Sequence, residues 1–234
     1  MAKHGKKYRK AVELLAEKSD FTLDEAVKLL KETSTTKFDA SCEIHMRLGI
    51  DTTQADQLVR STISLPHGTG KKVRVIAIVP DDKVKESLDA GAIKAGHEEL
   101  IDEIAKGFLD FDVVVATPDV MKNLGKVAKT LGTKGLMPNP KAGTVSPTPG
   151  KTIKEIAGGR VEYRTDKQGQ IHQIFGKVSF SEDQLKENLT TFVKAVTDAK
   201  PAAVKGVFVK NLCVATSMGP GIKLDVPSVM AEIK

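Results

Sequence analysis

Basic, aromatic and hydroxyl-bearing side chains gather in four short stretches of the chain. Lys and Arg neutralise phosphates, whereas hydroxyls, backbone amides and aromatic faces contact ribose and bases, so these stretches predict an RNA-binding surface. The first three are Lys37 with Phe38, then Arg60, then the group Arg160, Arg164, Asp166, Lys167 and His172. The fourth is Thr216, Ser217, Met218 and Gly219.

The spacing of the third stretch fits a strand followed by a turn. Arg160, Glu162 and Arg164 alternate by two, so they share one face of a strand. Asp166 and Lys167 would lie at the tip of the turn. There a carboxylate accepts a hydrogen bond from a ribose hydroxyl or a guanine edge, or holds an arginine in place.

The fourth stretch offers two hydroxyls and an unobstructed backbone N–H, which suits close packing against an RNA backbone. Each stretch also has a purely structural interpretation. Phe38 could belong to the core, Arg160–Arg164 could be a solvated strand face, and Met218–Gly221 could be only a turn. Asp166–Gly169 is predicted to be a turn whatever else it does.

The motifs of common enzymes are absent from the sequence. The first apolar run of the middle region ends in Val79-Pro80-Asp81-Asp82, whose acids would repel a phosphate, and His67–Lys71 lacks the earlier glycine of a phosphate loop. No nucleophile elbow, zinc-protease motif or paired-cysteine spacing occurs. We therefore expect no catalytic residue, metal or cofactor. The alternatives are a nucleotide- or sugar-phosphate-using enzyme on the middle region and a protein-interaction scaffold.

The net charge of +6 is concentrated at the start of the chain. Residues 1–10 contain five Lys or Arg and no acid, so the other residues together contribute only +1. This basic run predicts a phosphate-contacting arm, with a solubilising tail as the alternative. Cys42 and Cys213 lie in alternating apolar runs and are expected to be buried free thiols. No apolar run reaches the length of a membrane span.

Two helices and a half-buried strand are predicted in the first part of the chain. Residues 8–18 have helical spacing, and Thr22 with Glu25 forms a capping box that opens a helix through about Leu30. Apolar residues at every even position of Cys42–Ile50 indicate a strand of an antiparallel sheet with one wet face. A second strand is expected at Thr62–Leu65.

The middle of the chain has a different character. Val73–Val79 and Val113–Ala116 are nearly continuous apolar runs, which is typical of parallel strands covered on both faces. Helical stretches are predicted at residues 83–90, 98–106, 118–129 and 152–157. Alternating strands and helices favour a three-layer α/β domain.

The antiparallel character returns after Gly159. Strands at residues 160–165 and 170–175 are predicted to form a hairpin, and a helix begins at Ser181 and ends at Lys200-Pro201. Two further strands are expected at residues 207–216 and 222–225. These patterns predict a discontinuous α+β domain, residues 1–67 plus 159–234, with an α/β domain inserted at residues 68–158.

The stretch Leu131–Pro149 has neither helical nor strand periodicity and is rich in Gly and Pro, so a long functional loop is expected. The alternative is a mainly structural loop that covers the sheet. Its string Gly135-Leu136-Met137-Pro138-Asn139-Pro140-Lys141-Ala142-Gly143-Thr144-Val145 resembles the signature of the L-one family of large-subunit ribosomal proteins. The resemblance extends from Lys3-His4-Gly5-Lys6 to Thr216-Ser217-Met218-Gly219-Pro220. It departs at Ala215-Thr216-Ser217, where members often have a run of Thr.

The resemblance implies a split β-α-β end domain with an antiparallel sheet and a Rossmann-like middle domain. It also implies a non-enzymatic, cytoplasmic component of the large ribosomal subunit that binds 23S rRNA through its end domain. The residues that match the family's RNA contacts are Lys37, Phe38, Asp166, Lys167, His172 and Thr216–Gly219. A monomer is expected for the free protein.

Two further partners follow from the resemblance alone. The family forms a mobile stalk that contacts deacylated tRNA leaving the exit site, and Lys134 and Lys141 are our candidates for that contact. The family also implies that the free protein binds its own operon mRNA and represses translation. One surface cannot hold both rRNA and mRNA, so the two would compete.

Overall fold

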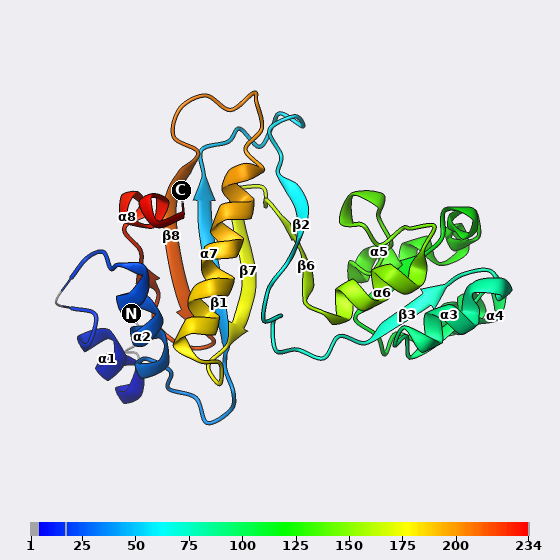
Figure 1. Cartoon of the computed structure of the whole chain (residues 1–234), viewed down its shortest axis with the longest axis horizontal. Helices are drawn as coiled ribbons and strands as arrows, with labels where there is room; N and C mark the ends of the chain where they lie inside the picture. Colours follow the sequence, from blue (N-terminus) through cyan, green and yellow to red (C-terminus); the bar gives the residue numbers. More distant parts are fainter. Residues whose placement is uncertain (1–4, 17, 234) are drawn as a thin grey trace. The chain divides into compact units, whose positions relative to one another are not determined.

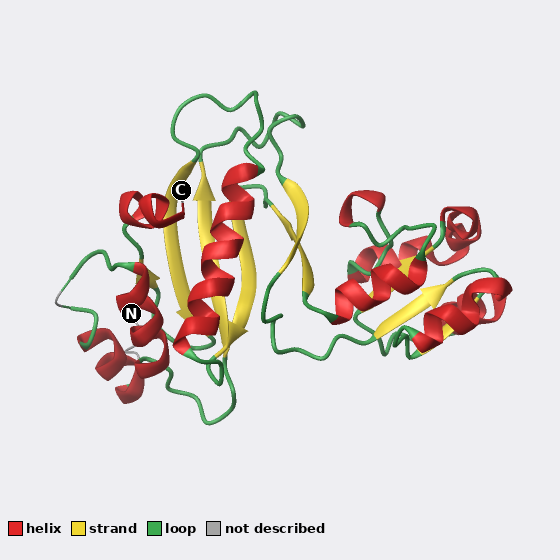
Figure 2. Cartoon of the chain, in the orientation of Figure 1, coloured by secondary structure: helices red, strands yellow, loops and turns green. Residues whose placement is uncertain are grey.

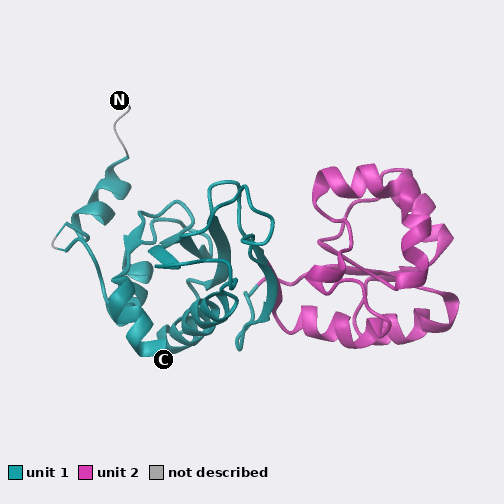
Figure 3. Ribbon diagram, turned by 90° about the horizontal axis from the view of Figure 1, so that it is seen from above, with its two compact units in different colours: residues 1–70, 163–234 teal, residues 71–162 magenta. Residues whose placement is uncertain are grey.

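The computed structural model describes residues 5–16 and 18–233, so Lys3 and His4 of the predicted basic run lie outside the described residues. The chain divides into two compact units (Figure 3). Unit 1 comprises Met1–Gly70 and Tyr163–Lys234, and unit 2 comprises Lys71–Glu162. The cuts fall after Gly70 and Glu162, whereas the sequence predicts them after His67 and Gly158.

Unit 1 is built around a four-stranded antiparallel sheet with the order β7-β1-β8-β9. The central strand β1 comes from the first part of the chain, and its neighbours come from the last part (Figure 1). The sheet strands are β1 (Ser41–Leu48), β7 (Gln170–Lys177), β8 (Val209–Thr216) and β9 (Ile222–Lys223). The helices are α1 (Lys6–Glu13), α2 (Leu23–Glu32), α7 (Glu182–Asp198) and α8 (Val226–Ile233).

The alternation of residues in β1 divides the sheet into a buried and a wet face, as predicted. Ile44 and Met46 are almost fully buried, whereas His45 and Arg47 on the intervening positions are accessible to solvent. Helices α2 and α7 cover the buried face (Figures 1 and 2). The wet face is therefore the side of unit 1 on which strand side chains are available to a partner.

Capping boxes begin both covering helices. In α2 the Thr22 side chain accepts from the Glu25 amide, as predicted, and in α7 the Ser181 side chain accepts from the Gln184 amide. Helix α1 is shorter than predicted, and only Ala11 of its residues is buried. Helix α8 was not predicted, because Asp225 was assigned to the preceding strand. In the structure the Asp225 carboxylate caps the helix, since Ser228 N donates to Asp225 Oδ2 at 3.2 Å.

The predicted hairpin around Asp166–Gly169 is wrong. The turn is present, since Gly169 N donates to Asp166 O at 3.3 Å, but the flanking strands belong to different sheets. Strand β7 pairs with β1, while β6 (Arg160–Arg164) pairs with β2 (Arg60–Ser64) in a two-stranded sheet. A local turn signal cannot report such long-range pairing.

Unit 2 has three layers around a parallel sheet of order β4-β3-β5 (Figure 3). Its strands are β3 (Val75–Ile78), β4 (Lys94–Gly96) and β5 (Val113–Ala116). Its α-helices are α3 (Val84–Asp89), α4 (Glu98–Ala105), α5 (Ala128–Lys134) and α6 (Pro149–Ala157). Three 3₁₀ helices complete it: η1 (Asp81–Lys83), η2 (Pro118–Val127) and η3 (Pro140–Ala142).

Two apolar clusters lie on the two faces of the parallel sheet. One contains Ile76 and Ile78 with residues of α4, η2 and α5, and the other contains Val75 and Ala77 with residues of α6. This layering and the antiparallel sheet of unit 1 agree with the predicted mixture of α/β and α+β structure. The short edge strand β4 and the 3₁₀ character of η2 were not predicted.

The predicted loop at Leu131–Pro149 is partly helical. Residues 131–134 complete α5, and Pro149 opens α6. Between them Leu136 and Met137 pack against the core, and Val145 forms a parallel bridge with Ala116 of β5. The segment therefore covers and extends the sheet.

Candidate RNA-binding surface

Lys37, Phe38 and Thr216–Gly219 lie at the end of the sheet where β1 begins, and we call them the Met218 patch. Ser217 N donates to Ser41 O at 3.0 Å, and Thr216 lies opposite Cys42 in the β1–β8 register. Lys37 and Phe38 stand just before Ser41 in the chain. The structure thus brings together two of the four predicted stretches.

The turn after β8 holds an apolar side chain out into solvent. Met218 has a φ of 67°, which makes it the non-glycine residue with positive φ among the described residues, and its side chain is 78% exposed. Phe38 is also exposed, at 60%, which contradicts its interpretation as a core residue. A strained backbone that presents an exposed side chain is a common feature of binding sites.

Thr216 adds a second unusual feature to the Met218 patch. Its residue exposure is only 3%, and its hydroxyl Oγ1 finds no hydrogen-bond partner among the described residues, a feature that it shares with Thr117 Oγ1 of unit 2. A side-chain carbon on Gly219 would collide with this hydroxyl, so the glycine is required for the closeness of the turn. An unpaired buried hydroxyl costs about 1–3 kcal/mol, so a role outside folding would account for it.

The Lys37–Phe38 loop is tied down by the residue that follows it. The Asp39 carboxylate accepts from the amide of Ser179 at 3.0 Å and from its hydroxyl at 2.9 Å, while Lys177 Nζ donates to Asp39 O at 3.3 Å. Thr36 Oγ1 donates to Phe38 O at 3.1 Å within the loop. These bonds fix the backbone that carries the exposed ring.

Asp166, Lys167 and His172 form a second group, the Lys167 patch, where β7 begins. Asp166 Oδ1 accepts from the amides of Gln168 and Gln170, each at 2.8 Å. Burial would raise the pKa of Asp166, but these two amides hold its pKa below the usual value. The carboxylate therefore organises the turn, and Lys167 is exposed beside it.

His172 of the Lys167 patch pairs with His45 across the wet face. The two Nδ1 atoms lie 2.9 Å apart, and the residues are opposite each other in the β1–β7 register. Asp166 Oδ2 lies 3.6 Å from His172 Nε2. Sequence reasoning placed His45 on the wet face but did not select it, because its partner is 127 positions away in the chain.

Arg60 and Arg164 lie on neighbouring strands of the small sheet. Arg60 begins β2 and Arg164 ends β6, and both are exposed. The adjacent residues are bonded, since Thr165 N donates to Val59 O at 2.9 Å. The two arginines are therefore both positioned by the strand pair β2–β6.

The structure assigns a different environment to Arg160. It belongs to unit 2, where its guanidinium Nη1 donates to Glu155 Oε2 at 2.6 Å and the group lies against Gly143. An ion pair already neutralises this side chain in part. Arg160 is therefore fixed by contacts within unit 2, whereas Arg164 belongs to unit 1.

Along β1 the Met218 patch and the Lys167 patch lie at opposite ends of the strand. Seven steps from Ser41 to Leu48 correspond to roughly 23 Å, since a strand rises about 3.3 Å per residue. Of the residues on the wet face of β1, Arg47 lies near the end that carries Lys167, and His45 lies directly opposite His172 of the Lys167 patch. The predicted residues thus form a line rather than one compact cluster.

Two candidate residues of unit 2, Lys134 at the end of α5 and Lys141 within η3, are both exposed.

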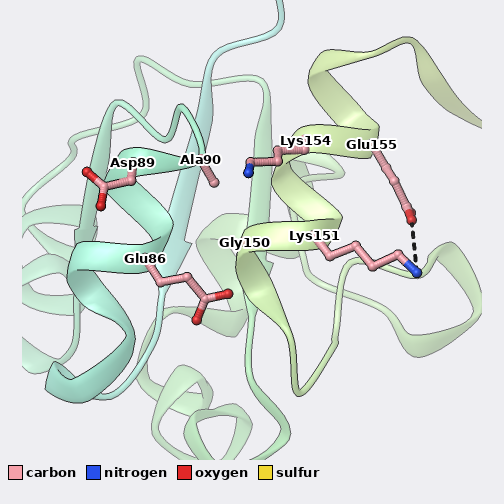
Figure 4. Close-up of a pocket in the computed structure, with 7 residues that line it drawn as sticks. All are labelled: Glu86, Asp89, Ala90, Gly150, Lys151, Lys154 and Glu155. Carbon is pink, nitrogen blue, oxygen red and sulfur yellow. Dashed lines mark ion pairs between the residues drawn. The ribbon is translucent and has the colours of Figure 1, made fainter.

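A groove between α3 and α6 also lies in unit 2 (Figure 4). It is lined by Glu86, Asp89, Ala90, Gly150, Lys151, Lys154 and Glu155. Lys151 Nζ already lies 4.0 Å from Glu155 Oε1, and the carboxylates on α3 would repel a phosphate. The groove therefore does not resemble a nucleotide site.

The remaining groups that could be reactive are the two cysteines and the side chains that could bind a metal. Both cysteines are free; Cys42 is buried, with its pKa raised to about 12 by desolvation, while Cys213 is half-buried rather than buried as predicted. No metal-binding group of three or more His, Cys, Asp or Glu occurs among the described residues. Within residues 5–16 and 18–233, no helix is long and apolar enough to cross a bilayer.

Comparison with known proteins places the sequence in a family. The sequence profile of the ribosomal protein L1p/L10e family matches residues 30–220. The chain belongs to the ribosomal protein L1p/L10e family. It is 51% identical over 235 residues to the large ribosomal subunit protein uL1 of Fervidobacterium nodosum, covering 100% of both chains. It is 49% identical over 226 residues to that of Thermus thermophilus, covering 96% of this chain and 99% of the relative.

Membership of the L1p/L10e family confirms the resemblance predicted from the loop string and the chain ends. This is a family of ribosomal proteins rather than of enzymes. The match begins at residue 30 and ends at residue 220, so it includes both the Met218 patch up to Gly219 and the Lys167 patch.

Proposed function

We propose that this protein is a constituent of the large ribosomal subunit that binds 23S rRNA through the wet side of unit 1. The observation that carries the proposal is the Met218 patch. A fixed turn with an unpaired buried hydroxyl projects Met218 next to the anchored Lys37–Phe38 loop. The relatives, named as large-subunit proteins, support the assignment.

Shape contributes more than bulk charge to this recognition. Outside residues 1–10, unit 1 contains 16 Lys or Arg and 17 Asp or Glu, so it has no excess of positive charge. Affinity must then come from placed groups: the exposed Phe38 and Met218, the basic Lys37 and Lys167, and hydroxyls that reach ribose. Arg60 and Arg164 extend the surface along the second sheet.

The finer features of the family complete the proposal. Unit 1 has a split β-α-β arrangement, and unit 2 is the domain inserted into it. The protein acts in the cytoplasm on the ribosome and is a monomer when free. Unit 2 contacts deacylated tRNA near the exit site through Lys134 and Lys141, which aids tRNA release.

The same surface of unit 1 also binds the protein's own operon mRNA and represses its translation. Because a single surface cannot hold two RNAs, rRNA and mRNA compete for it, and the tighter site fills first. The free protein then represses only when rRNA is scarce.

A double substitution, Thr216→Val with Met218→Asp, tests the proposal. We expect it to weaken the binding of both a 23S rRNA fragment and the operon mRNA, because it removes a hydroxyl and places a negative charge against phosphates. A filter-binding titration with each RNA measures the effect. Loss of binding to one RNA alone would show that the surfaces are separate.

Two controls distinguish lost contacts from lost folding. Thr216→Val alone removes an unpaired buried hydroxyl at nearly constant shape, so it should raise the free energy of unfolding by about 1 kcal/mol. Val207→Asp puts the same charge on another exposed apolar residue of unit 1, which is 72% exposed, and should leave RNA binding unchanged.

A further inference from the structure

Four ionisable side chains form a row across the wet face of unit 1. Glu43 Oε2 lies 3.9 Å from His45 Nε2, and the other ring nitrogen of His45, Nδ1, lies 2.9 Å from His172 Nδ1. His172 Nε2 in turn lies 3.6 Å from Asp166 Oδ2. The row therefore runs from carboxylate to imidazole to imidazole to carboxylate, and it has three junctions at which a hydrogen can be shared.

The two imidazoles of the row meet end to end. Their Nδ1 atoms are 2.9 Å apart, whereas the ring centroids are 5.1 Å apart and the ring planes are inclined by 59°. The centroid separation is close to the largest that this nitrogen contact allows, so the rings do not stack and each Nδ1 points at the other. Such a contact is favourable only when one Nδ1 carries a hydrogen and the other offers a lone pair.

A metal ion does not fit between the two rings in this arrangement. Imidazole nitrogens lie about 2.0–2.1 Å from zinc, so two nitrogens that point at each other across an ion would be about 4 Å apart. The observed separation of 2.9 Å is instead that of a hydrogen bond. The cation that joins the two rings is therefore a proton.

The carboxylates at the two ends set how many protons the row holds best. The Asp166 carboxylate favours a hydrogen on His172 Nε2, which leaves Nδ1 of that ring as an acceptor for the Nδ1 hydrogen of His45. If His45 is neutral, its Nε2 has no hydrogen and faces the Glu43 carboxylate as a second acceptor. One additional proton on His45 Nε2 gives each of the three junctions a donor and an acceptor.

The same geometry opposes a second additional proton. It would place hydrogens on both Nδ1 atoms, which are only 2.9 Å apart, and two positive charges in direct contact. Two cations nearby, Arg47 on β1 and Lys167 in the turn before β7, also oppose it. On β8 the residue opposite His45 is Cys213, a thiol whose pKa is raised by burial. The two histidines therefore titrate as one site that accepts one proton.

The free protein holds this additional proton weakly. Burial, and then the neighbouring His172, lower the pKa of His45, and Glu43 offsets the shift only in part. At neutral pH most of the free protein therefore lacks the proton. The His172 side chain is 49% exposed and lies near the exposed Lys167. A phosphate bound at the Lys167 patch would thus lie close enough to stabilise a positive charge on the pair.

We infer that the His45–His172 pair takes up a single proton when rRNA binds, which makes it a pH-sensitive part of the rRNA site. The inference rests on the proposed function, because it assigns a regulation to the surface that binds rRNA there. The proton comes from the solvent, and its charge stays on the two rings beside the phosphate. The affinity for rRNA then increases as the pH falls, down to the pH at which the free protein is itself protonated.

Calorimetric titration of the full chain with the 23S rRNA fragment counts the protons directly. Titrations at one pH in two buffers of different ionisation enthalpy give the number of protons taken up for each RNA bound. We expect an uptake that approaches one proton, and an affinity that increases by about tenfold at most for each unit by which the pH falls. No uptake, or an uptake of more than one proton, would overturn the inference.

Matched substitutions assign the proton to the pair. His45→Gln with His172→Gln keeps a polar side chain on both strands but removes both imidazoles, so the proton uptake should disappear. The control is His67→Gln, since His67 Nε2 lies 2.6 Å from Glu187 Oε2 of α7, which covers the other face of the sheet. This control should retain the wild-type uptake. An uptake that persists in the double variant would contradict the inference.

Nuclear magnetic resonance of the ring nitrogens gives a readout that needs no substitution. The ¹⁵N shifts distinguish a neutral ring with its hydrogen on Nδ1 or Nε2 from a charged ring. At neutral pH we expect two neutral rings at His45 and His172 in the free protein, and one positive charge on the pair in the rRNA complex. Two neutral rings, or two charged rings, in the complex would overturn the inference.

These measurements separate the inference from the proposed function. A wild-type protein that selects the 23S rRNA fragment without taking up a proton would refute the inference and leave the proposed function intact. A protein that binds all RNA fragments equally at every pH would refute the proposed function, and the inference would lose its basis with it.

Discussion

Thr216 and Met218 show how single residues can be set for binding at a cost to folding. Thr216 Oγ1 is buried without a partner, and Met218 adopts a φ of 67° that L-residues seldom adopt. Neither feature contributes to the stability of unit 1. Both become understandable if the turn is shaped for a ligand, since strain of this kind persists only where the surrounding structure holds it in place.

The His45–His172 pair makes the stability of unit 1 depend on pH. Burial, and then the neighbouring His172, lower the pKa of His45 below 6.5, while Glu43 opposes the shift. Cys213 of β8 lies opposite His45 in the sheet. The Nδ1–Nδ1 hydrogen bond also requires that one ring be neutral there.

We expect the free energy of unfolding to fall as the pH falls below about 6.5. The unfolded chain takes up a proton on His45 at a higher pH than the folded chain does, so acid favours unfolding. His45→Gln should flatten this part of the profile. Urea titrations between pH 8 and pH 5 measure both curves, and an equally steep loss in the variant would contradict the assignment.

Local signals identified many individual residues correctly, but pairings could not be predicted. The capping box at Thr22 and the alternation of Ile44 with His45 are local patterns, and the structure confirms both. The contact of His45 with His172 depends on strand register between distant segments. The burial of Thr216 likewise follows from packing over β1 and not from its neighbours in sequence.

Helix α1 is the element that provides most of the excess charge of unit 1. Lys6, Lys7, Arg9 and Lys10 are all exposed on it. A groove at this end of unit 1 is lined by Lys7, Lys10 and Glu13 of α1, by Glu32 of α2, and by Ser34 and Thr35 after α2. Thr35 precedes Lys37 by two positions and Phe38 by three, so this groove adjoins the loop of the Met218 patch.

Neutralising α1 should therefore reduce the salt dependence of rRNA binding more than its sequence selectivity. For Lys6→Gln, Lys7→Gln and Lys10→Gln together, we expect a loss in slope of about 0.7–0.9 for each phosphate contact removed. The matched control is Lys28→Gln, Lys194→Gln and Lys205→Gln, which are exposed lysines elsewhere in unit 1. An unchanged slope for the α1 variant would identify the basic run as a solubilising tail.

Periodicity predicted most strands and helices. It did not predict which strands pair or which segments pack over the sheet, because both depend on contacts between distant parts of the chain. The strands flanking Asp166–Gly169 are not a hairpin, because β1 pairs with β7 and β2 pairs with β6. Residues 131–134 were assigned to a loop, yet Leu131 is fully buried and completes α5. The glycine-rich composition of this stretch does not indicate a helix, because the end of α5 is stabilised by packing rather than by helix propensity.

At the scale of the whole molecule, the two ends of the chain form one sheet around β1. Phe21 N donates to Lys223 O at 3.0 Å, and β1 pairs with both β7 and β8, so residues before Gly70 and after Tyr163 depend on one another. Changes of composition at the two crossings indicated this organisation. The exact cuts depend on contacts that no local pattern contains.

The central claim is that unit 1 alone recognises a particular contour of rRNA. The most direct measurement is the affinity of residues 1–70, joined by a short Gly-Ser linker to residues 163–234, for 23S rRNA fragments over a range of salt concentrations. Our account predicts a folded unit that selects the same fragment as the full chain, with an affinity that Met218→Asp abolishes. A folded unit that binds all fragments equally, or that ignores Met218→Asp, would contradict it.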